Sequence, residues 1–600
     1  MNNIQRSGTR SERSRWPALA AKMSSPDVTH NENKRFTMKQ KVDRWMVNEG
    51  YRRIFVAIFV LLHLLVFGFG FLHYTLKVWV LLGGGNDNLV GPRAVFGITL
   101  PIARSAALVL HVDVALILLP VCRNLISMAR QTALNGIIQF GMFVMGLVRV
   151  LGAVDMFVDK NITFHKMTAW SIVFFSWLHT IAHWNNFAQL AIREKLGFVG
   201  WLQANFVSGP GWTGYIMLIC LMIMAVTAMD KPRRANFERF WYSHHLFLVF
   251  FLFWSFHGAF CMIKPDRPPF CDGIGVFWKF WMLGGLLYLG ERIMREIRGK
   301  HKTYISKVIE HPSNVVEIQI KKEHTKANAG QYIFLCCPEV SIWQYHPFTL
   351  TSAPEEDYIS VHVRMVGNFT KALGKTLGCD IDKKGGRADK SKRRESRVIG
   401  VDKNTKEDVD PAIRRVLPRV YIDGPFGSAS EDVFKYEVSV LVGAGIGVTP
   451  FASILKSIWY RSNYPQKKTR LHKVYFFWIC RDFGSFEWFR SLLLAIEAQD
   501  IGHLIEIHTY LTAKIKPDDA TNIMINDANA EKDAITGLRA PTNFGRPNWD
   551  TVFKSIRAIH KPAEVGVFFC GPKPLGSTLH VKCNQYSEPG FSFVWGKENF

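Results

Sequence analysis

The sequence predicts a bundle of six transmembrane helices, followed by an antiparallel β-barrel and then by a doubly wound α/β domain. Apolar stretches long enough to cross a bilayer are confined to residues 54–294. Short β-rich runs begin near Ile305, and after Val438 the order becomes strand, glycine-rich loop, helix and strand. These observations divide the chain into a polar tail, the bundle, the barrel and the α/β domain, at residues 1–45, 46–298, 299–430 and 431–600.

The N-terminal tail is polar and basic, and it lacks the apolar core of a cleaved signal peptide. We expect it to be disordered and cytosolic. The formal net charge of the whole chain is +25, but Lys and Arg gather in the tail, beside the apolar stretches and near Lys390. This distribution favours an anionic membrane surface over nucleic acid as a partner. The ten cysteines include no C-x-x-C pair, which argues against structural zinc and against thioredoxin-like redox chemistry.

Six apolar segments meet or approach the roughly 20 residues that a spanning helix needs. They are residues 54–76, 98–121, 165–187, 212–229, 240–260 and 274–294. The basic residues that flank them all fall on one side if both termini are cytosolic, as the positive-inside rule requires. We therefore expect a multi-pass protein of the plasma membrane or an internal membrane. A further apolar segment, Gly136–Val154, would invert this orientation if it crossed, so we expect it to lie at the cytosolic interface or to be re-entrant.

Two of the predicted helices each carry a pair of histidines within the apolar region, where ionisable side chains are costly and usually functional. His165 and His179 belong to the third helix, and His244 and His257 belong to the fifth. At about 1.5 Å per helical residue, the two pairs are separated by roughly 21 and 20 Å along their helices. Matched depths predict two b-type haems, an inner one between His165 and His244 and an outer one between His179 and His257, because imidazole is an axial ligand of haem iron. The spacing on the fifth helix does not return to the same helix face, and on spacing alone His245 is an alternative to His244.

Two more polar residues lie toward the outer end of the predicted bundle. Arg104 is on the second helix, and His183 follows His179 by one turn. Together they could bind an anionic oxygen species beside the outer haem, although each alone is also typical of an interfacial anchor. The four paired histidines could likewise hydrogen-bond within the bundle or line a proton pathway.

The run HPFTLTSAP, at residues 346–354, places small hydroxyl side chains on a strand beside a proline turn. This composition suits close approach to a flavin ring and its ribityl chain. The candidates for binding FAD are His346, Pro347, Phe348, Thr349, Thr351 and Ser352. Downstream, Arg364 could pair with a pyrophosphate, with Gly367 and Thr370 as further donors. Either run alone would also fit an ordinary strand and turn.

A glycine-rich turn, GAGIGVTP at residues 443–450, follows an apolar strand and opens a helix. Unpaired N–H groups and the helix dipole favour phosphate at such a position. Its candidate binding residues are Gly443, Gly445, Gly447, Thr449 and Pro450. Later strands end at Arg481 and at Cys570-Gly571, and ligands bind at such strand ends in open α/β sheets. Arg481 and Arg546 are candidates for the 2′-phosphate that separates NADP from NAD. Cys570 could lie near a nicotinamide, although a structural cysteine is the ordinary interpretation.

Taken together, the motifs resemble those of the NADPH oxidase family. The matching segments run in the family's order from about Trp45 to Phe600, and they are FHKMTAW, HTIAHW, FWYSHHLF, HPFTLTSAP, DGPFG, VGAGIGVTPF, WICRDFGSFEWF, GRPNWD and KENF. The resemblance implies a ferric-reductase-like bundle, FAD in a ferredoxin-reductase-like barrel, NADPH on the α/β domain, and superoxide made from molecular oxygen. It also implies that Arg104 and His183 form the oxygen site and that Phe600 lies near the flavin ring. The partners it implies are a small membrane subunit, a cytosolic organiser or activator and a Rac-type GTPase.

Two segments depart from the phagocyte-type pattern: the apolar segment 136–154 and the basic segment 383–415, which we expect to be a disordered insertion. Cys261 and Cys271 lie in the predicted outer loop, on an oxidising side of the membrane, and we expect them to form a disulfide. Two other functions remain open at this point. One is a ferric-chelate reductase of the same superfamily, and the other is a proton-conducting membrane protein with a degenerate reductase domain.

Overall fold

The computed structural model describes most of the chain outside the N-terminal tail. The described residues are 37–77, 96–128, 161–260, 275–311, 314–322, 325–379, 396–402, 413–464, 469–481, 486–498, 504–512, 532–533 and 536–598. Four predictions lie outside them: the interfacial segment 136–154, the disulfide between Cys261 and Cys271, the position of Phe600, and the tail up to residue 36. The chain divides into a helical unit, Tyr51–Met294, and a second unit made of Met1–Gly50 and Arg295–Phe600.

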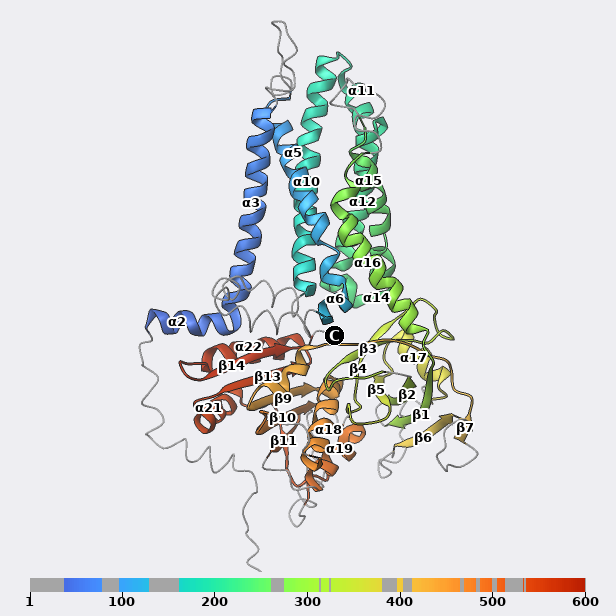
Figure 1. Cartoon of the computed structure of the whole chain (residues 1–600), viewed down its shortest axis with the longest axis vertical. Helices are drawn as coiled ribbons and strands as arrows, with labels where there is room; N and C mark the ends of the chain where they lie inside the picture. Colours follow the sequence, from blue (N-terminus) through green and yellow to red (C-terminus); the bar gives the residue numbers. More distant parts are fainter. Residues whose placement is uncertain are drawn as a thin grey trace, which may run out of the picture. The chain divides into compact units, whose positions relative to one another are not determined.

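Long helices build the helical unit, and they run alongside one another in Figure 1. They are α3 (Tyr51–Lys77), α5 (Thr99–Leu116), α10 (Asn161–Arg193), α12 (Gly209–Ala228), α14 (Phe237–His244), α15 (Phe247–His257) and α16 (Trp278–Gly299). Shorter helices are η3 (Leu119–Val121), α6 (Arg123–Met128), α11 (Gly197–Leu202), η5 (Gln203–Val207) and α13 (Asp230–Ala235). Contacts of α5 with both α3 and α10, and of α12 with α15, enclose one apolar core. These helices coincide with the six predicted spans, except that the fifth span is two helices with a break between them.

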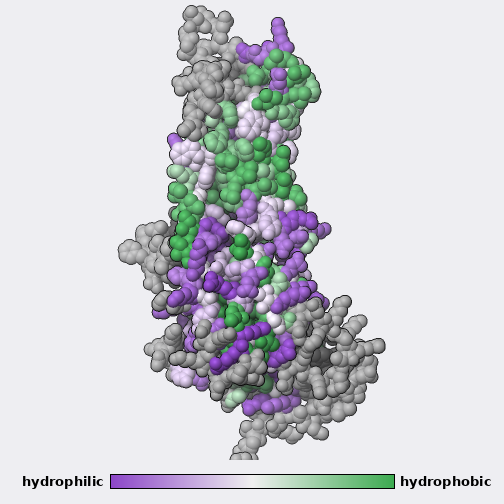
Figure 2. Space-filling view, turned by 90° about the vertical axis from the view of Figure 1, so that its right-hand side faces the viewer, coloured by the Kyte–Doolittle hydropathy of each residue, from purple (hydrophilic) through white to green (hydrophobic). Residues whose placement is uncertain are grey.

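Three helical segments among the described residues are long and apolar enough to cross a membrane, namely Arg52–Leu76, Thr99–Val121 and Gly209–Ala228. Much of their apolar surface faces outward; Leu64, Leu65 and Phe69 of α3 are each at least 60% exposed. Figure 2 shows hydrophobic side chains gathered over the surface of the bundle. The other predicted spans differ for physical reasons: α10 is rich in His, Asn and Trp, the fifth span is broken, and α16 ends in charged residues.

The last residues of the predicted tail are ordered. Helix α2 (Met38–Trp45) begins at a capping box between Thr37 and Gln40, and η2 (Met46–Gly50) follows it. The Arg44 guanidinium donates hydrogen bonds of 2.8 Å to the carbonyls of Asn584 and Gln585. Both carbonyls belong to the last turn of a C-terminal helix, where they lack intrahelical partners. The disordered tail was therefore predicted to extend too far, because Arg44 finds this acceptor site near the opposite end of the chain.

Residues 303–426 of the second unit form two sheets around one core. The first has the order β5-β2-β1-β6-β7, with β1 (Thr303–His311), β2 (Val315–Lys322), β5 (Ile359–Arg364), β6 (Arg397–Asp402) and β7 (Arg414–Arg415). The second has the order β4-β3-β8, with β3 (Tyr332–Cys336), β4 (His346–Thr349) and β8 (Tyr421–Phe426). All pairs are antiparallel except β6 with β7, and α17 (Asn368–Thr376) follows β5. Strands β2 and β3 fall where they were predicted.

The prediction of a disordered insertion over residues 383–415 is wrong for β6 and β7, while residues 383–395 and 403–412 lie outside the described residues. Residues 397–401 pair with Lys307–Glu310 of β1, and Val401 is fully buried. The surrounding Lys, Arg and Asp residues made this short strand difficult to predict, although its apolar residues are directed into the barrel.

The rest of the second unit is a parallel sheet with the order β12-β11-β10-β9-β13-β14. Its strands are β9 (Val438–Ala444), β10 (Lys473–Cys480), β11 (Ile505–Leu511), β12 (Thr542–Phe544), β13 (Glu564–Cys570) and β14 (Ser592–Lys597). Its helices are η7 (Ala429–Lys435), η8 (Gly445–Val448), α18 (Thr449–Asn463), α19 (Glu487–Ala498), α21 (Trp549–His560) and α22 (Lys573–Tyr586). Helices α18 and α19 pack into one core and α21 and α22 into another, so both faces of the sheet are covered (Figure 1). The predicted doubly wound fold is confirmed.

Candidate functional site

The four predicted haem ligands form two facing imidazole pairs between α10 and the α14–α15 segment. The ring centres of His165 and His244 are 6.2 Å apart, and those of His179 and His257 are also 6.2 Å apart. Two metal–imidazole bonds of about 2 Å, with roughly 1.1 Å from each nitrogen to its ring centre, would separate two axial rings by about 6 Å. Both pairs are therefore spaced to hold one metal ion each, as two axial haem ligands require.

Hydrogen bonds fix the orientation of three of these rings. The Nδ1 atoms of His165 and His179 lie 3.0 and 2.9 Å from the carbonyl oxygens of Ile117 and Ala103 on the neighbouring chain segment. The Nδ1 atom of His257 lies 2.8 Å from the hydroxyl of Thr213 on α12. A partner at Nδ1 leaves Nε2 as the ligand atom, which is the usual arrangement for metal-binding histidines.

The break between α14 and α15 explains how His257 can align with His244 despite a spacing that does not match the helical repeat. The amides of His245 and Leu246 bond to the carbonyls three residues earlier, at 3.2 and 3.1 Å, so the chain makes a tighter turn there. This turn changes the helical phase between His244 and His257. The two histidines between which the sequence could not choose lie differently: the exposed His245 bonds to the carbonyl of Trp241 at 2.8 Å, whereas His244 faces His165.

The predicted oxygen-site residues lie beside the outer pair. The ring of His183 is 4.5 Å from that of His179, and its Nδ1 atom lies 3.4 Å from the amide nitrogen of Asn186. The positive charge of Arg104 interacts electrostatically with His179, His183 and His257. The structure thus brings both predicted residues to the pair for which they were predicted.

A buried polar network in the helical unit escaped the sequence analysis. His63 of α3 bonds through Nε2 to the carboxylate of Asp113 on α5 at 2.7 Å, and Ser171 of α10 donates to the other carboxylate oxygen at 2.7 Å. Asp113 is fully buried and His63 is 5% exposed. The network joins three helices at the level of α10 between His165 and His179. An Asp and a His on two separate apolar helices carry no spacing signal that could have revealed it.

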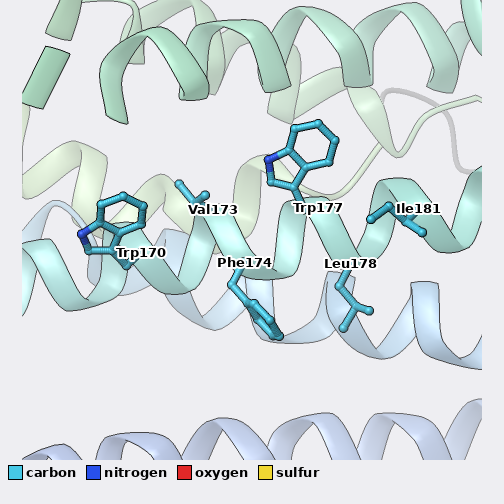
Figure 3. A pocket seen from close by; sticks show the side chains of 6 residues that line it. All are labelled: Trp170, Val173, Phe174, Trp177, Leu178 and Ile181. Carbon is cyan, nitrogen blue, oxygen red and sulfur yellow. The ribbon is translucent and has the colours of Figure 1, made fainter. Parts of the chain in front are cut away.

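An apolar groove of about 420 Å³ runs along a different face of α10. Figure 3 shows its lining side chains, which are Trp170, Val173, Phe174, Trp177, Leu178 and Ile181. By helical phase this face points away from His165 and His179, and Phe174 is 63% exposed. The groove is therefore separate from the imidazole pairs and is an outward-facing surface of the bundle.

The predicted flavin residues lie on β4 and the segment that follows it. The His346 ring stacks on Phe369 of α17 at 3.9 Å, and burial lowers the pKa of His346. Pro347 is exposed and Phe348 is half-buried, whereas Thr349 is buried. The hydroxyls of Thr351 and Ser352 serve the barrel itself: Thr351 bonds to Ser360 and His362, and Ser352 accepts the amide of Ser360. Of the predicted residues, His346, Pro347 and Phe348 therefore offer the most accessible surface.

The predicted pyrophosphate residues surround the beginning of α17. Arg364 is exposed at the end of β5, and Gly367 caps the helix. The Thr370 hydroxyl accepts the amides of Val366 and Gly367 at 3.1 and 3.0 Å, which shapes the turn into the helix. A guanidinium beside a helix N-terminus suits an anion.

The glycine-rich turn lies at the switch point of the parallel sheet, where β9 and β13 are neighbours and the strand order reverses. Cys570 at the end of β13 pairs with Gly443 at the end of β9. Gly445 has a φ of +58°, and a Cβ on Gly447 would lie 2.5 Å from the Cys570 carbonyl oxygen. Ligands bind at this crevice in doubly wound folds, and the glycines there keep it open to a close approach.

The remaining predicted nucleotide residues share the same edge of the sheet. Thr449 and Pro450 begin α18, and Gly571 directly follows β13. Arg481 follows β10 and Arg546 follows β12, and both are exposed. The parallel strands bring these residues, which are distant in sequence, to one edge.

Two buried carboxylates near these sites were not predicted. Glu598 accepts the hydroxyls of Ser428 and Ser430 at 2.9 and 2.5 Å, and its amide donates to Phe569. Asp423 of β8 is 1% exposed and accepts hydrogen bonds from Arg295 and Arg298 in the last turns of α16. Asp423 opens the DGPFG motif, and nothing in that motif indicates these arginine partners.

Comparison with known proteins identifies the relatives of this architecture. The chain is 38% identical over 579 residues to a superoxide-generating NADPH oxidase heavy chain of Dictyostelium discoideum, covering 94% of this chain and 100% of that protein. It is 35% identical to NADPH oxidase 1 of Mus musculus, covering 93% and 95%, and 35% identical to NADPH oxidase 3 of Homo sapiens, covering 93% and 99%. The chain belongs to the NADPH oxidase family.

Three domain families match successive parts of this NADPH oxidase. They are the ferric reductase like transmembrane component at residues 132–254, the FAD-binding domain at residues 301–430 and the ferric reductase NAD binding domain at residues 436–584. The predicted fold class and family are thereby confirmed. The NADPH oxidase chain is a membrane protein that carries an FAD-binding domain and an NAD-binding domain.

Proposed function

We propose that this chain generates superoxide by transferring electrons from NADPH across a membrane to molecular oxygen. The observation that carries the proposal is the presence of two imidazole pairs, each with ring centres 6.2 Å apart, in a chain that also contains FAD-binding and NAD-binding domains. The Dictyostelium relative named as superoxide-generating supports the same activity.

Two b-type haems and FAD are the cofactors that this function needs. His165 with His244 would hold the inner haem and His179 with His257 the outer one, while the face of His346, Pro347 and Phe348 and the Arg364 turn would hold FAD. Bound there, these groups would supply the conversion of a two-electron hydride donor into single electrons, at FAD, and the one-electron carriers, at the two haems.

The residues of the switch-point crevice would bind NADPH. Gly445 and Gly447 let the dinucleotide approach the backbone, and the beginning of α18 offers N–H groups to a phosphate. The exposed Arg481 and Arg546 would recognise the 2′-phosphate. Burial raises the pKa of the Cys570 thiol to about 12, so this side chain stays neutral beside the nicotinamide position.

At the outer pair, Arg104 and His183 would act on oxygen. The guanidinium charge stabilises a superoxide anion as it forms, because a preorganised cation favours developing negative charge. The His183 ring, packed against that of His179, would complete the site.

The positive-inside pattern supports cytosolic termini, which would place the NADPH and FAD sites in the cytosol. We also propose, from the family resemblance, that a small membrane subunit, a cytosolic organiser or activator and a Rac-type GTPase control the enzyme. The plasma membrane or an internal membrane would be its location, with anionic lipid at the cytosolic face.

The decisive experiment measures superoxide formation by the purified full-length chain. Cytochrome c reduction that requires NADPH and is abolished by superoxide dismutase is the expected result, with and without candidate activators. Formation of reduced iron from a ferric chelate in the absence of superoxide would support a ferric-chelate reductase instead. A reduced-minus-oxidised spectrum without b-haem bands would favour the proton-conducting alternative.

Two variants test the order in which electrons would pass through the proposed sites. Changing Arg364→Ala should abolish haem reduction by NADPH, whereas Arg104→Ala should leave both haems reducible and slow oxygen consumption. An Arg104→Ala protein that keeps both haems but loses their reduction would show that the proposed exit site is wrong.

A further inference from the structure

Three potential metal ligands meet on one face of the five-stranded sheet. They are His311 at the end of β1, Glu317 on β2 and His362 on β5. Glu317 pairs directly with His362 across the strands, and His311 pairs with Val315, which lies on the same face of β2 as Glu317. None of the three has a role in the function proposed above.

The distances between their polar atoms are too long for hydrogen bonds and close to those within a metal site. The Nε2 atoms of His311 and His362 lie 3.6 and 3.7 Å from the same oxygen, Oε2 of Glu317. All three ligand atoms lie within 4.8 Å of one another. Tetrahedral zinc, with bonds of about 2.0–2.2 Å, separates its ligand atoms by about 3.4 Å. The buried Nε2 of His311 has no hydrogen-bond partner among the described residues, and it lies at ion-pair distance from Glu317.

The outer atoms of all three side chains are held by polar neighbours. His311 Nδ1 lies 2.7 Å from the Ser396 hydroxyl, and His362 Nδ1 lies 2.8 Å from the Thr351 hydroxyl. Gln319 donates to Oε1 of Glu317 at 3.1 Å, which leaves Oε2 directed at the imidazoles. Such outer hydrogen bonds orient first ligands in metal sites and select Nε2 as the coordinating atom.

We propose that His311, Glu317 and His362 bind a divalent transition-metal ion of the zinc class, with a fourth position left for water. Two imidazoles and one carboxylate form a ligand set suited to Zn²⁺. The sequence argued against structural zinc because it lacks C-x-x-C pairs, but a site made of two histidines and a glutamate carries no such signature. The metal ion would link β1, β2 and β5. The His362 ring also lies 4.7 Å from the Trp488 ring on α19. The metal ion would therefore also stabilise the packing of the five-stranded sheet against the α/β domain.

The test uses purified full-length protein that has been treated with a chelator and dialysed against Zn²⁺. Zinc is measured by elemental mass spectrometry, and FAD and haem by their spectra. Wild-type protein should retain roughly one Zn²⁺ per chain more than Glu317→Gln, whose side chain is isosteric but a poor metal ligand. The matched control is Glu310→Gln, a neighbour on β1 whose carboxylate bonds to Arg397 at 2.8 Å and should not affect zinc.

Two further measurements make the site specific. Ser396→Ala should weaken zinc binding about 10- to 100-fold, because it removes the orienting partner of His311. X-ray absorption at the zinc edge should show only nitrogen and oxygen neighbours, including imidazoles. Should Glu317→Gln lose FAD as well as zinc, His311→Gln at the end of its strand replaces it as the deciding variant.

Equal zinc in wild type and in the deciding variant, with FAD retained, would overturn the proposal. A sulfur-coordinated zinc, or a wild-type protein that holds no zinc above that variant, would overturn it equally. Because these readouts do not depend on superoxide formation, their failure is distinguishable from failure of the proposed function.

Discussion

The candidate sites of the helical unit and of the second unit are formed by different chemical groups, side chains in the first and backbone in the second. In the helical unit the side chains form the site: His165 faces His244 and His179 faces His257 across two helices. At the switch point of the second unit the backbone forms it, through glycines such as Gly445 and Gly447 and the beginning of α18. A helix satisfies its own backbone groups, so only its side chains can reach a ligand, whereas strand ends and helix N-termini leave N–H groups available.

The largest effect is expected when a histidine of one of the two pairs is replaced. His257→Leu should abolish one of the two b-haems while leaving NADPH-dependent flavin reduction intact, because the outer pair then lacks one of its two proposed axial imidazoles. Reduced-minus-oxidised spectra and the haem content per chain measure this loss. His245→Leu is the matched control and should keep both haems, since its ring bonds to the Trp241 carbonyl. Retention of two low-spin haems in His257→Leu would contradict the ligand assignment.

Next in size is the buried polar network of the helical unit. Asp113→Ala leaves His63 without its partner in an apolar interior and should destabilise the protein by about 3–5 kcal/mol. Melting of the detergent-solubilised protein, followed by haem absorbance, measures the change. Ser171→Ala removes a single hydrogen bond to the same carboxylate and should cost only about 1 kcal/mol. Equal melting temperatures for the two variants would show that the His63–Asp113 pair does not support the bundle.

In the second unit the corresponding change adds a methyl group to the backbone site. A Cβ at Gly447 would lie 2.5 Å from the Cys570 carbonyl oxygen, so Gly447→Ala should cost about 1–3 kcal/mol and raise the KM for NADPH. Gly290→Ala on α16 is the control, because a Cβ there meets nothing within 4 Å. An unchanged KM in Gly447→Ala would argue that the dinucleotide does not approach this turn closely.

The smallest effect is expected at Thr213. Of the three hydrogen bonds that orient the paired histidines, only the one from Thr213 to His257 comes from a side chain. Thr213→Val removes the hydroxyl at 2.8 Å from His257 Nδ1 and should weaken retention of the outer haem about tenfold. The rate of haem transfer to an excess of a haem-scavenging protein measures it. A loss confined to the inner haem would be inconsistent with the pairing.

What the sequence could predict follows the same division between the units. The candidate histidines could be selected because the spacing of His165 and His179 on one helix fixes both depth and face, and the candidate nucleotide turn could be selected because glycines mark special backbone geometry. The partners of these residues were not readable. The carbonyl of Ile117 and the hydroxyl of Thr213 are 48 and 44 residues from the histidines they orient, and only packing brings them together.

The errors have local causes. No proline or glycine marks the break at His245 and Leu246 in the sequence, so residues 240–260 were predicted as one helix. The charged residues around β6 outweighed its short apolar pattern, and Arg44 was assigned to a disordered tail because its acceptors lie in α22. Glu598 is a similar case, since its serine partners are 168 and 170 residues away.

The break between α14 and α15 also bears on how such a bundle can change during evolution. A residue inserted between His165 and His179 turns the later ring by about 100° and separates it from its partner. The irregular turn at His245–Leu246 can absorb an inserted or deleted residue by adding or losing a tight hydrogen bond. Descendants of this chain should therefore tolerate length changes between His244 and His257 far better than between His165 and His179. Insertions and deletions in related sequences should accordingly be found mainly in the first of these two intervals.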